Sequence, residues 1–422
     1  MNERQRFFSS YYNLPKSVIV LFIARIIHSI GSFVYPFLTM FLTIKLGYTE
    51  VKAGYFVTGV IIAGSIGMIS GGRLADLVGR KKIFLTFSFA SATLFLICAF
   101  LGNSPIVPWL LILSNLFLGG VMPAMNAMLT DVSDPDKRKE AFSLIYLGTN
   151  IGVAIGPLIA GFLFYDYTKL IFILDAFTTY LSLIPVIIFV KETTPSPEKI
   201  MEINNSNRAY EKAESGSTLS ILLKRPIFLA FSFISLIYTF VYSQNYFSLP
   251  LYLNEIFKES GARVYGSIMS INALVVILLT VFLINLMKNT KPIINIAFAG
   301  VLYAVGFGMI FFLANRLLLI ISTIIWTLGE IVQTINTSVF VADNSPITHR
   351  ARFSSIVSFI TELGFIISPI LMGHFIENYG TRNVWILVFF LAMSGAILMY
   401  ILYLFEGYRK LHRKNDKQQK MF

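Results

Sequence analysis

Long apolar stretches separated by short polar segments fill almost the whole chain. Twelve stretches have about 20 or more residues, the length that an α-helix needs to cross the hydrocarbon core of a bilayer. The pattern therefore predicts an all-α membrane protein with twelve transmembrane helices. The stretches cover residues 18–44, 53–71, 83–101, 107–130, 141–164, 170–190, 227–251, 264–286, 293–313, 317–341, 353–376 and 384–405.

One long polar segment divides these stretches into six and six. It covers residues 191–225 and is rich in Glu, Lys, Asn and Ser. We interpret it as a cytoplasmic connector that tethers two six-helix bundles. The sequence then predicts an N-terminal bundle at residues 1–190, the linker at 191–225, a C-terminal bundle at 226–408 and a basic cytoplasmic tail at 409–422.

Composition excludes a water-soluble protein. The 422 residues are 56% hydrophobic and 13% charged, whereas soluble domains carry about 25% charged residues. The net charge of +12 does not indicate nucleic-acid binding, because the basic residues lie between apolar stretches. The only cysteine, Cys98, excludes a disulfide framework and a cysteine metal cluster. With no P-loop and no HExxH motif, the sequence predicts neither an enzyme nor a cofactor or metal site.

The distribution of basic residues predicts the orientation in the membrane. If the N-terminus is cytoplasmic, most of the 34 Lys and Arg residues lie in cytoplasmic segments, as the positive-inside rule requires. Both termini are then cytoplasmic, and the protein is a multi-pass component of the cytoplasmic (inner) membrane. No cleavable signal peptide is expected, because the first apolar stretch is long enough to span. The basic tail is expected to contact anionic lipids.

The two halves of the chain resemble each other. Four residues of the fourth and fifth stretches recur 212 positions later, which is half the chain length. Such a repeat is typical of transporters whose substrate site lies between two pseudo-symmetric halves. We expect the Asp and Arg pairs to be cytoplasmic gate residues with a structural role. The recurring residues are Asp131, Arg138, Pro157 and Gly161, repeated as Asp343, Arg350, Pro369 and Gly373.

The loop between the second and third stretches carries a charged signature. It reads Gly-Gly-Arg-Leu-Ala-Asp-Leu-Val-Gly-Arg-Lys-Lys at residues 71–82 and closely resembles the loop motif of the major facilitator superfamily. The resemblance implies a charge cluster that latches the cytoplasmic side and breaks when the halves rock. The alternative is that these basic residues only enforce topology. The predicted gating residues here are Gly72, Arg73, Asp76, Gly79 and Arg80.

A glycine pattern in the fifth stretch suggests export. Gly148, Gly152, Gly156, Pro157 and Gly161 look like the fifth-helix motif of the drug:proton antiporter branch of that superfamily. Small residues every four positions give a smooth face for close packing, and proline bends a helix. The alternative is ordinary helix packing. Asn115 occupies the place where antiporters of this branch often carry arginine, which leaves the usual proton-coupling route in doubt.

Ionisable residues inside the apolar stretches are candidates for proton coupling or substrate binding. Each charged group costs about 2.5–3.5 kcal/mol at the bilayer centre, so it is retained for a function by default. Glu330 is the strongest candidate, because a buried carboxyl group can exchange a proton for a cationic substrate. The alternative is a static buried ion pair, such as Arg25 with Glu362. The candidates are Glu330, Glu362, Arg25, His28 and Asp175.

Aromatic and amide side chains are candidates for the lining of a substrate cavity. Aromatic walls tolerate varied lipophilic substrates and attract cations. Tyr238, Tyr242 and Tyr246 follow one another at a spacing of four, which places them on one face of a helix. For most aromatic residues the alternative is core packing or lipid contact. The predicted lining residues are Tyr35, Asn115, Tyr146, Asn150, Tyr238, Tyr242, Gln244, Tyr246 and Trp326.

The sequence as a whole predicts a secondary transporter that works by alternating access. The favoured hypothesis is proton-coupled efflux of lipophilic or cationic drug-like compounds by a monomer, with the proton gradient as its energy source. Small molecules, protons and membrane lipids are the expected partners. One alternative is a carrier for a specific sugar, amino acid or lipid. An alternative of another class is a receptor or sensor that does not transport.

Overall fold

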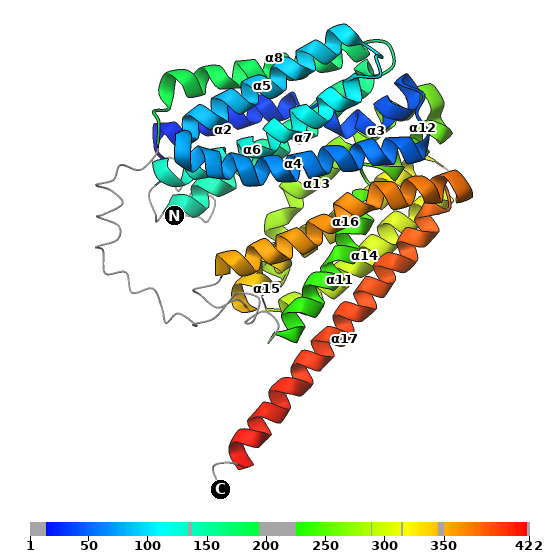
Figure 1. The fold of residues 1–422 in the computed structure, drawn as a ribbon. Coiled ribbons are helices and arrows are strands. Elements are labelled where there is room, and N and C mark those ends of the chain that lie inside the picture. The colour runs from blue at the N-terminus through cyan, green and yellow to red at the C-terminus, as the bar shows by residue number, and fades with distance from the viewer. Residues whose placement is uncertain are drawn as a thin grey trace. The chain divides into compact units, whose positions relative to one another are not determined.

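In the computed structural model, the regular elements of the described residues are all helices (Figure 1). These are residues 14–133, 137–193, 225–287, 289–313, 315–344 and 350–419, without the side chains of 139, 342, 343, 350–356 and 408–419. Contacts divide the chain into two units. The first contains Met1–Asn207 and Leu249–Ile277, and the second contains Arg208–Ser248 and Leu278–Phe422.

The first unit contains the first six spans. The first span consists of α2 followed by short helical pieces, α3 (Leu38–Met40) among them, and the next five are single helices. After the polar linker, the unit also takes in α12 and the start of α13. The bounds are α2 Lys16–Ile30, α4 Glu50–Val78, α5 Arg80–Leu101, α6 Val107–Val132, α7 Arg138–Leu163, α8 Thr168–Phe189, α12 Ser248–Phe257 and α13 Gly261–Met287.

The second unit contains the seventh span and the last four. Its closest helix pairs are α14 with α15, α14 with α17, and α11 with α16. Helix α17 runs without interruption into the C-terminal segment, so the backbone of the predicted tail is helical as far as Gln419 (Figure 1). The bounds are α11 Pro226–Ser243, α14 Pro292–Met309, α15 Arg316–Asn344, α16 Arg350–Tyr379 and α17 Val384–Gln419.

The structure confirms an all-α protein with twelve membrane spans. Eleven segments of the described residues are long and apolar enough to cross a bilayer. One of them, Pro226–Met287, has 62 residues and contains α11, α12 and α13. Because about 20 residues suffice to cross a bilayer, this segment supplies the seventh and eighth spans. The predicted linker lies outside the described residues from 194 to 224, so the domain boundaries stay a prediction.

Two predicted helices are interrupted, and this corrects the sequence prediction. The stretch 18–44 is not one helix, because α2 ends at Ile30 and a 3₁₀ turn starts at Tyr35. The stretch 227–251 is likewise broken between Ser243 and Ser248. The breaks hold only a few polar residues, Ser32 in the first and Gln244 and Asn245 in the second, so hydropathy averaged over about 20 residues does not reveal them.

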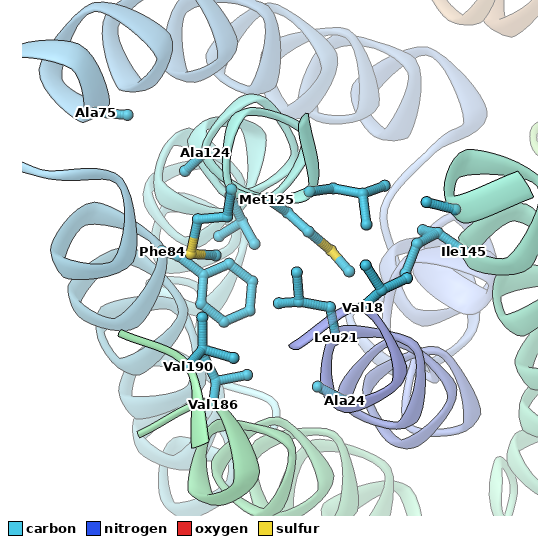
Figure 2. Close-up of a cluster of buried hydrophobic side chains, with 14 of the residues drawn as sticks. Val18, Leu21, Ala24, Ala75, Phe84, Ala124, Met125, Ile145, Val186 and Val190 are labelled. Atoms are coloured by element: carbon cyan, nitrogen blue, oxygen red, sulfur yellow. The ribbon is translucent and has the colours of Figure 1, made fainter. Parts of the chain in front are cut away.

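An apolar core closes one end of the first unit. Six helices meet there: the start of α2, the end of α4, the start of α5, the end of α6, the start of α7 and the end of α8. Their side chains point toward one another around Phe84 and Met125 (Figure 2). Val18, Leu21 and Met128 in this cluster have no exposed surface. The same helix ends carry the charged loop signature, so the core fixes the position of these charges.

Candidate transport site

The break in the first span is held by a carboxylate from another helix. The backbone amides of Phe33 and Val34 follow the end of α2, and that of Phe33 also donates to the carbonyl oxygen of Gly31 at 2.7 Å. Both donate a hydrogen bond to Oδ2 of Asp175 on α8, each at 3.1 Å. Asp175 is 3% exposed. The break therefore satisfies its free amide groups inside the protein, as an interrupted helix in a membrane must.

Close packing surrounds this break. A side chain at Gly31 would overlap Thr178 of α8, with only 1.6 Å between its Cβ position and Thr178 Oγ1. On the other side, Gly152 and Gly156 of α7 face Ser29 and Ile30, at Cβ-position distances of 2.2 and 2.6 Å. The glycine face of the fifth-span motif thus packs against α2 next to its broken end.

The other end of the motif packs against α13. The Cβ position of Gly161 is 2.6 Å from the carbonyl oxygen of Ala262, and that of Gly266 is 2.2 Å from the carbonyl oxygen of Pro157. Beyond α7, the hydroxyl of Tyr165 lies 2.5 Å from Asn254 Oδ1. Partial burial raises the pKa of Tyr165. The motif therefore joins α7 to α2 at one end and to α13 at the other.

Three of the predicted residues in the first span lie near the break. Nε of Arg25 donates to Thr149 Oγ1 of α7 at 2.8 Å. Nδ1 of His28 lies 3.3 Å from Thr179 Oγ1 of α8. The hydroxyl of Tyr35 donates to the carbonyl oxygen of Leu111 at 3.1 Å. Arg25, His28 and Asp175 thus belong to one polar region where α2 meets α7 and α8.

Glu330 lies among aromatic side chains of the second unit. It is part-buried on α15, one turn beyond the fully buried Trp326. Tyr242 of α11, Tyr246 and Tyr303 all lie close enough to Glu330 to interact with it electrostatically. This arrangement surrounds a carboxylate with aromatic side chains, which is suited to bind a cation.

Further aromatic contacts extend this group. The ring centre of Tyr242 lies 6.0 Å from that of Trp326 and 6.2 Å from that of Phe365. Trp326 in turn stacks on Phe307, with the ring centres 5.3 Å apart. Tyr303 donates a hydrogen bond to Gln333 Oε1 at 2.7 Å. The surroundings of Glu330 therefore combine packed aromatic rings with tyrosine hydroxyl groups.

The break in the seventh span is held by uncharged side chains. Gln244 is fully buried; its Nε2 donates to Ser368 Oγ at 2.5 Å, and its Oε1 accepts from Ser248 Oγ at 2.6 Å. Because α11 ends at Ser243, Tyr246 lies beyond the helix and does not share a helical face with Tyr242. This corrects the prediction made from the spacing of four.

The remaining predicted lining residues are placed differently. Asn115 donates to the carbonyl oxygen of Val60 at 2.7 Å, which places it at the contact of α6 with α4. Tyr238 is fully buried beside Gly300 and Gly395. Tyr146 is 53% exposed, and Asn150, one turn later, donates to its carbonyl oxygen. Glu362 is an exposed residue of α16.

The charged loop signature forms an ion-pair cluster. Arg80 at the start of α5 pairs with Asp131 at the end of α6, and its Nη2 is 3.6 Å from Oδ1 of Asp76. Gly79 separates α4 from α5 with φ +126°, a conformation that favours glycine. Arg138 is exposed at the start of α7. The side chains of Asp343 and Arg350 lie outside the described residues.

Glu192 is a member of this cluster that sequence reasoning missed. Its carboxylate accepts hydrogen bonds from the backbone amides of Lys81 and Lys82, at 3.1 and 3.2 Å. These amides are at the N-terminus of α5, where a negative charge is favourable. The first residues of the linker are thereby attached to the signature loop. The sequence gave no signal for this contact, because a Glu just after an apolar stretch is common and its partners lie about 110 residues away.

The family follows from the sequence. Residues 20–346 and 296–421 match the model of the Major Facilitator Superfamily. The chain belongs to this superfamily. It is therefore a multi-pass membrane protein and a secondary transporter of small molecules, and it is not an enzyme.

Relatives of this superfamily transporter include proteins with and without a known function. It is 23% identical over 397 residues to the uncharacterized MFS-type transporter YqjV of Bacillus subtilis (strain 168), covering 91% of each chain. It is 24% identical over 400 residues to a Na(+), Li(+), K(+)/H(+) antiporter of Planococcus maritimus, covering 88% of this chain and 92% of the other. Over 154 residues it is 31% identical to efflux pump azaK of Aspergillus niger, covering 34% and 32%.

Solved structures of superfamily transporters share the fold. A mutant of the nucleoside transporter NupG gives a TM-score of 0.75 at 15% identity, covering 92% of this chain and all of the other. The peptide transporter POT in complex with sulfate gives 0.74 at 17% identity, covering 94% and 96%. These likenesses support the major facilitator fold with its two six-helix halves.

Proposed function

We propose that this transporter exchanges protons for lipophilic or cationic compounds and thereby exports them. The observation that carries this proposal is the position of Glu330. It is an ionisable side chain inside a membrane span, and Tyr242, Tyr246 and Tyr303 lie close enough to interact with it electrostatically. A carboxylate surrounded by aromatic faces and hydroxyl groups can hold either a proton or an organic cation.

The exchange follows from competition at one group. In its charged form, Glu330 attracts a cation, and the aromatic faces of Tyr242 and Trp326 add their own attraction for positive charge. In its protonated form, it no longer offers a charge to the substrate. A proton that arrives from the opposite side of the membrane therefore releases the cation, and the cation displaces the proton. Alternating access between the two sides turns this competition into antiport.

Two further observations support export by antiport. The glycine pattern of α7, which looks like the drug:proton antiporter motif, packs against α2 through Gly152 and Gly156. A relative that matches over most of its length is an antiporter of monovalent cations and protons. The relative also favours a second candidate function, exchange of Na⁺, Li⁺ or K⁺ for protons, in which Glu330 would bind the metal cation. A narrow metabolite carrier remains the third candidate.

The deciding experiment uses proteoliposomes with wild type and Glu330→Gln side by side. A pH gradient is imposed, and the movement of ethidium is followed by fluorescence. We expect wild type to move the dye in response to the gradient and Glu330→Gln to fall to the level of protein-free liposomes. The matched control is Glu377→Gln, which changes an exposed carboxylate near the end of α16 and is expected to transport as wild type does.

Three other outcomes would contradict parts of this proposal. Gradient-driven transport by Glu330→Gln at the wild-type rate would remove Glu330 from the coupling mechanism. Failure of any lipophilic cation to move, with Na⁺ or K⁺ moving instead, would favour the cation/proton antiporter. If neither moves with folded protein, a metabolite carrier becomes the better hypothesis, and a solute screen follows.

A further inference from the structure

A cavity in the second unit is separate from the surroundings of Glu330. It measures about 320 Å³ and lies between the end of α13, the start of α14 and the second half of α15. Ile284 and Val339 in its lining are 45% and 42% exposed, so the cavity opens to the outside of the unit. The lining consists of Leu283, Ile284, Met287, Thr290, Pro292, Ile335, Asn336 and Val339.

The cavity faces away from the candidate transport site. Successive residues of an α-helix are about 100° apart around its axis, which puts Ile335 and Val339 about 140° and 180° from Glu330 on α15. Glu330 faces Tyr242 of α11. Ile335 and Val339 face the cavity instead. The opposite side of a membrane helix from its polar site contacts lipid or a neighbouring helix. The opening is therefore on the side of α15 that faces away from Glu330.

Bulky residues in α13 explain why the cavity exists. In the first unit, α4 meets α6 through small residues: the Cβ positions of Gly67 and Gly71 are 1.8 and 2.4 Å from the backbone of α6. The residues 212 positions later are Leu279 and Leu283. Two leucines cannot allow such a close approach of helix backbones. The end of α13 thus stands off from its neighbours, and Leu283 lines the resulting space.

The polar groups of the lining already have partners. Thr290 Oγ1 donates to Asn295 Oδ1 at 2.7 Å, and Asn295 Nδ2 donates to Asn336 Oδ1 at 2.8 Å. Asn336 Nδ2 donates to the carbonyl oxygen of Val332 at 2.8 Å. No water is needed to satisfy them, and the other six lining side chains are apolar. Because most of the lining is apolar and its polar groups are paired, the cavity suits hydrocarbon.

Positive charge lies at one end of the cavity. Lys291 follows Thr290, is exposed, and holds its ammonium group 5.0 Å from the ring centre of Tyr403 on α17. Lys288 is close to it in the sequence. One candidate membrane span ends at Met287 and the next begins at Pro292. An apolar slot inside the membrane with lysine at its outer end matches a lipid chain with an anionic headgroup.

We propose that this cavity binds one acyl chain of an anionic phospholipid, whose phosphate group lies next to Lys291. The chain fills the space between α13 and α15 that the leucines leave open, and the bound lipid is a structural ligand and not a transported substrate. This proposal does not depend on the transported compound.

The test is photolabelling in liposomes. The protein is reconstituted with phosphatidylglycerol that carries a diazirine on its acyl chain, and the adducts are mapped by mass spectrometry. We expect adducts concentrated on residues 283–287 and 335–339. Val339→Trp fills part of the cavity, so at least two methylenes of the acyl chain lose their contact with the protein. The resulting loss of binding is expected to lower labelling of these residues about tenfold. The matched control is Leu391→Trp in the apolar groove between α11, α16 and α17, which should leave this labelling unchanged.

Further variants make each part of the proposal falsifiable. If Val339→Trp does not fold, Ile335→Phe, which adds less volume, replaces it. Photolabelling of the cavity residues is expected to fall in this variant too. The same probe on phosphatidylcholine should label these residues less, and Lys291→Gln should remove that preference. Adducts spread evenly over all helices, or unchanged by the filling variants, would overturn the site. Equal labelling by both lipids would overturn the headgroup assignment, and displacement by a transported dye would make the cavity part of the transport path.

Discussion

Asp175 is a buried carboxylate whose hydrogen bonds define its role. It accepts from two backbone amides at the break of the first span, and an uncompensated amide in a membrane is costly. The sequence made Asp175 a candidate for proton coupling, and that role stays a prediction. Its geometry favours a different one, in which Asp175 holds the free amides of the break, while Glu330 lies in an environment suited to exchange a proton for a cation.

A pair of variants separates the two roles of Asp175. Asp175→Asn keeps an acceptor oxygen and loses only the charge, so we expect a decrease of about 1 kcal/mol in the free energy of unfolding per hydrogen bond. Asp175→Ala leaves the buried amide of Val34 without this acceptor, at about 1–3 kcal/mol, and leaves the amide of Phe33 with the carbonyl oxygen of Gly31. In thermal unfolding in detergent, we expect the midpoint temperature to be highest for wild type, lower for Asp175→Asn and lowest for Asp175→Ala.

Transport by the same variants decides the question. We expect Asp175→Asn to retain gradient-driven transport with an unchanged pH profile, because no titrating group of the coupling mechanism is lost. If Asp175→Asn abolishes coupling as completely as Glu330→Gln, then Asp175 carries a proton and the positioning role is wrong.

At the scale of elements, the first and seventh spans are both interrupted. Helix α2 ends at Ile30 and α11 at Ser243, which are matching places of the 212-residue repeat. The first break is held by a carboxylate and the second by Gln244 and Ser368. The glycine face of α7 lies against the end of α2, so the fifth-span motif supports the first break as well as packing two helices.

This contact predicts that a larger side chain on the glycine face of α7 lowers the stability of the protein. Gly152→Val places a side chain where only 2.2 Å separates the Cβ position from Ser29. We expect a loss of about 1–3 kcal/mol in the free energy of unfolding, because overpacking forces the helices apart. The control Ile155→Val, one turn away on an exposed position, should change the free energy of unfolding by less than about 0.5 kcal/mol. Thermal unfolding of purified protein measures both, and equal stability of the two variants would contradict the close contact.

At the scale of the whole molecule, the chain is a transporter with twelve spans, but its orientation in the membrane rests on charge alone. Basic residues predict that the α13–α14 loop is cytoplasmic and that the α5–α6 loop is exterior. Both loops offer an exposed asparagine, Asn289 and Asn103. The native Cys98 is fully buried, which makes the unmodified protein a suitable background for cysteine labelling.

A membrane-impermeant maleimide tests the orientation in intact cells. We expect Asn103→Cys to be labelled without permeabilisation and Asn289→Cys only after it. The unmodified protein, with only Cys98, should stay unlabelled in both conditions. Labelling of Asn289→Cys alone in intact cells would mean that both termini lie outside.

The sequence by itself determined the class, the number of spans and the superfamily, because these depend on hydropathy over about 20 residues and on two short motifs. It also named Glu330, because a charge inside an apolar stretch is visible in one dimension. The charged loop was predicted as a cluster, and Arg80, Asp76 and Asp131 do lie together.

Only the tertiary structure decided what each polar group touches. The helix breaks hold too few polar residues to be visible in hydropathy averaged over a span, and the acceptor for the first break, Asp175, comes from a helix more than 140 residues away. Glu192 reaches the start of α5 in the same way. The cavity beside α13 exists because Leu279 and Leu283 keep this helix away from its neighbours. Such contacts depend on side chains brought together across the fold, which a pattern along one chain does not encode.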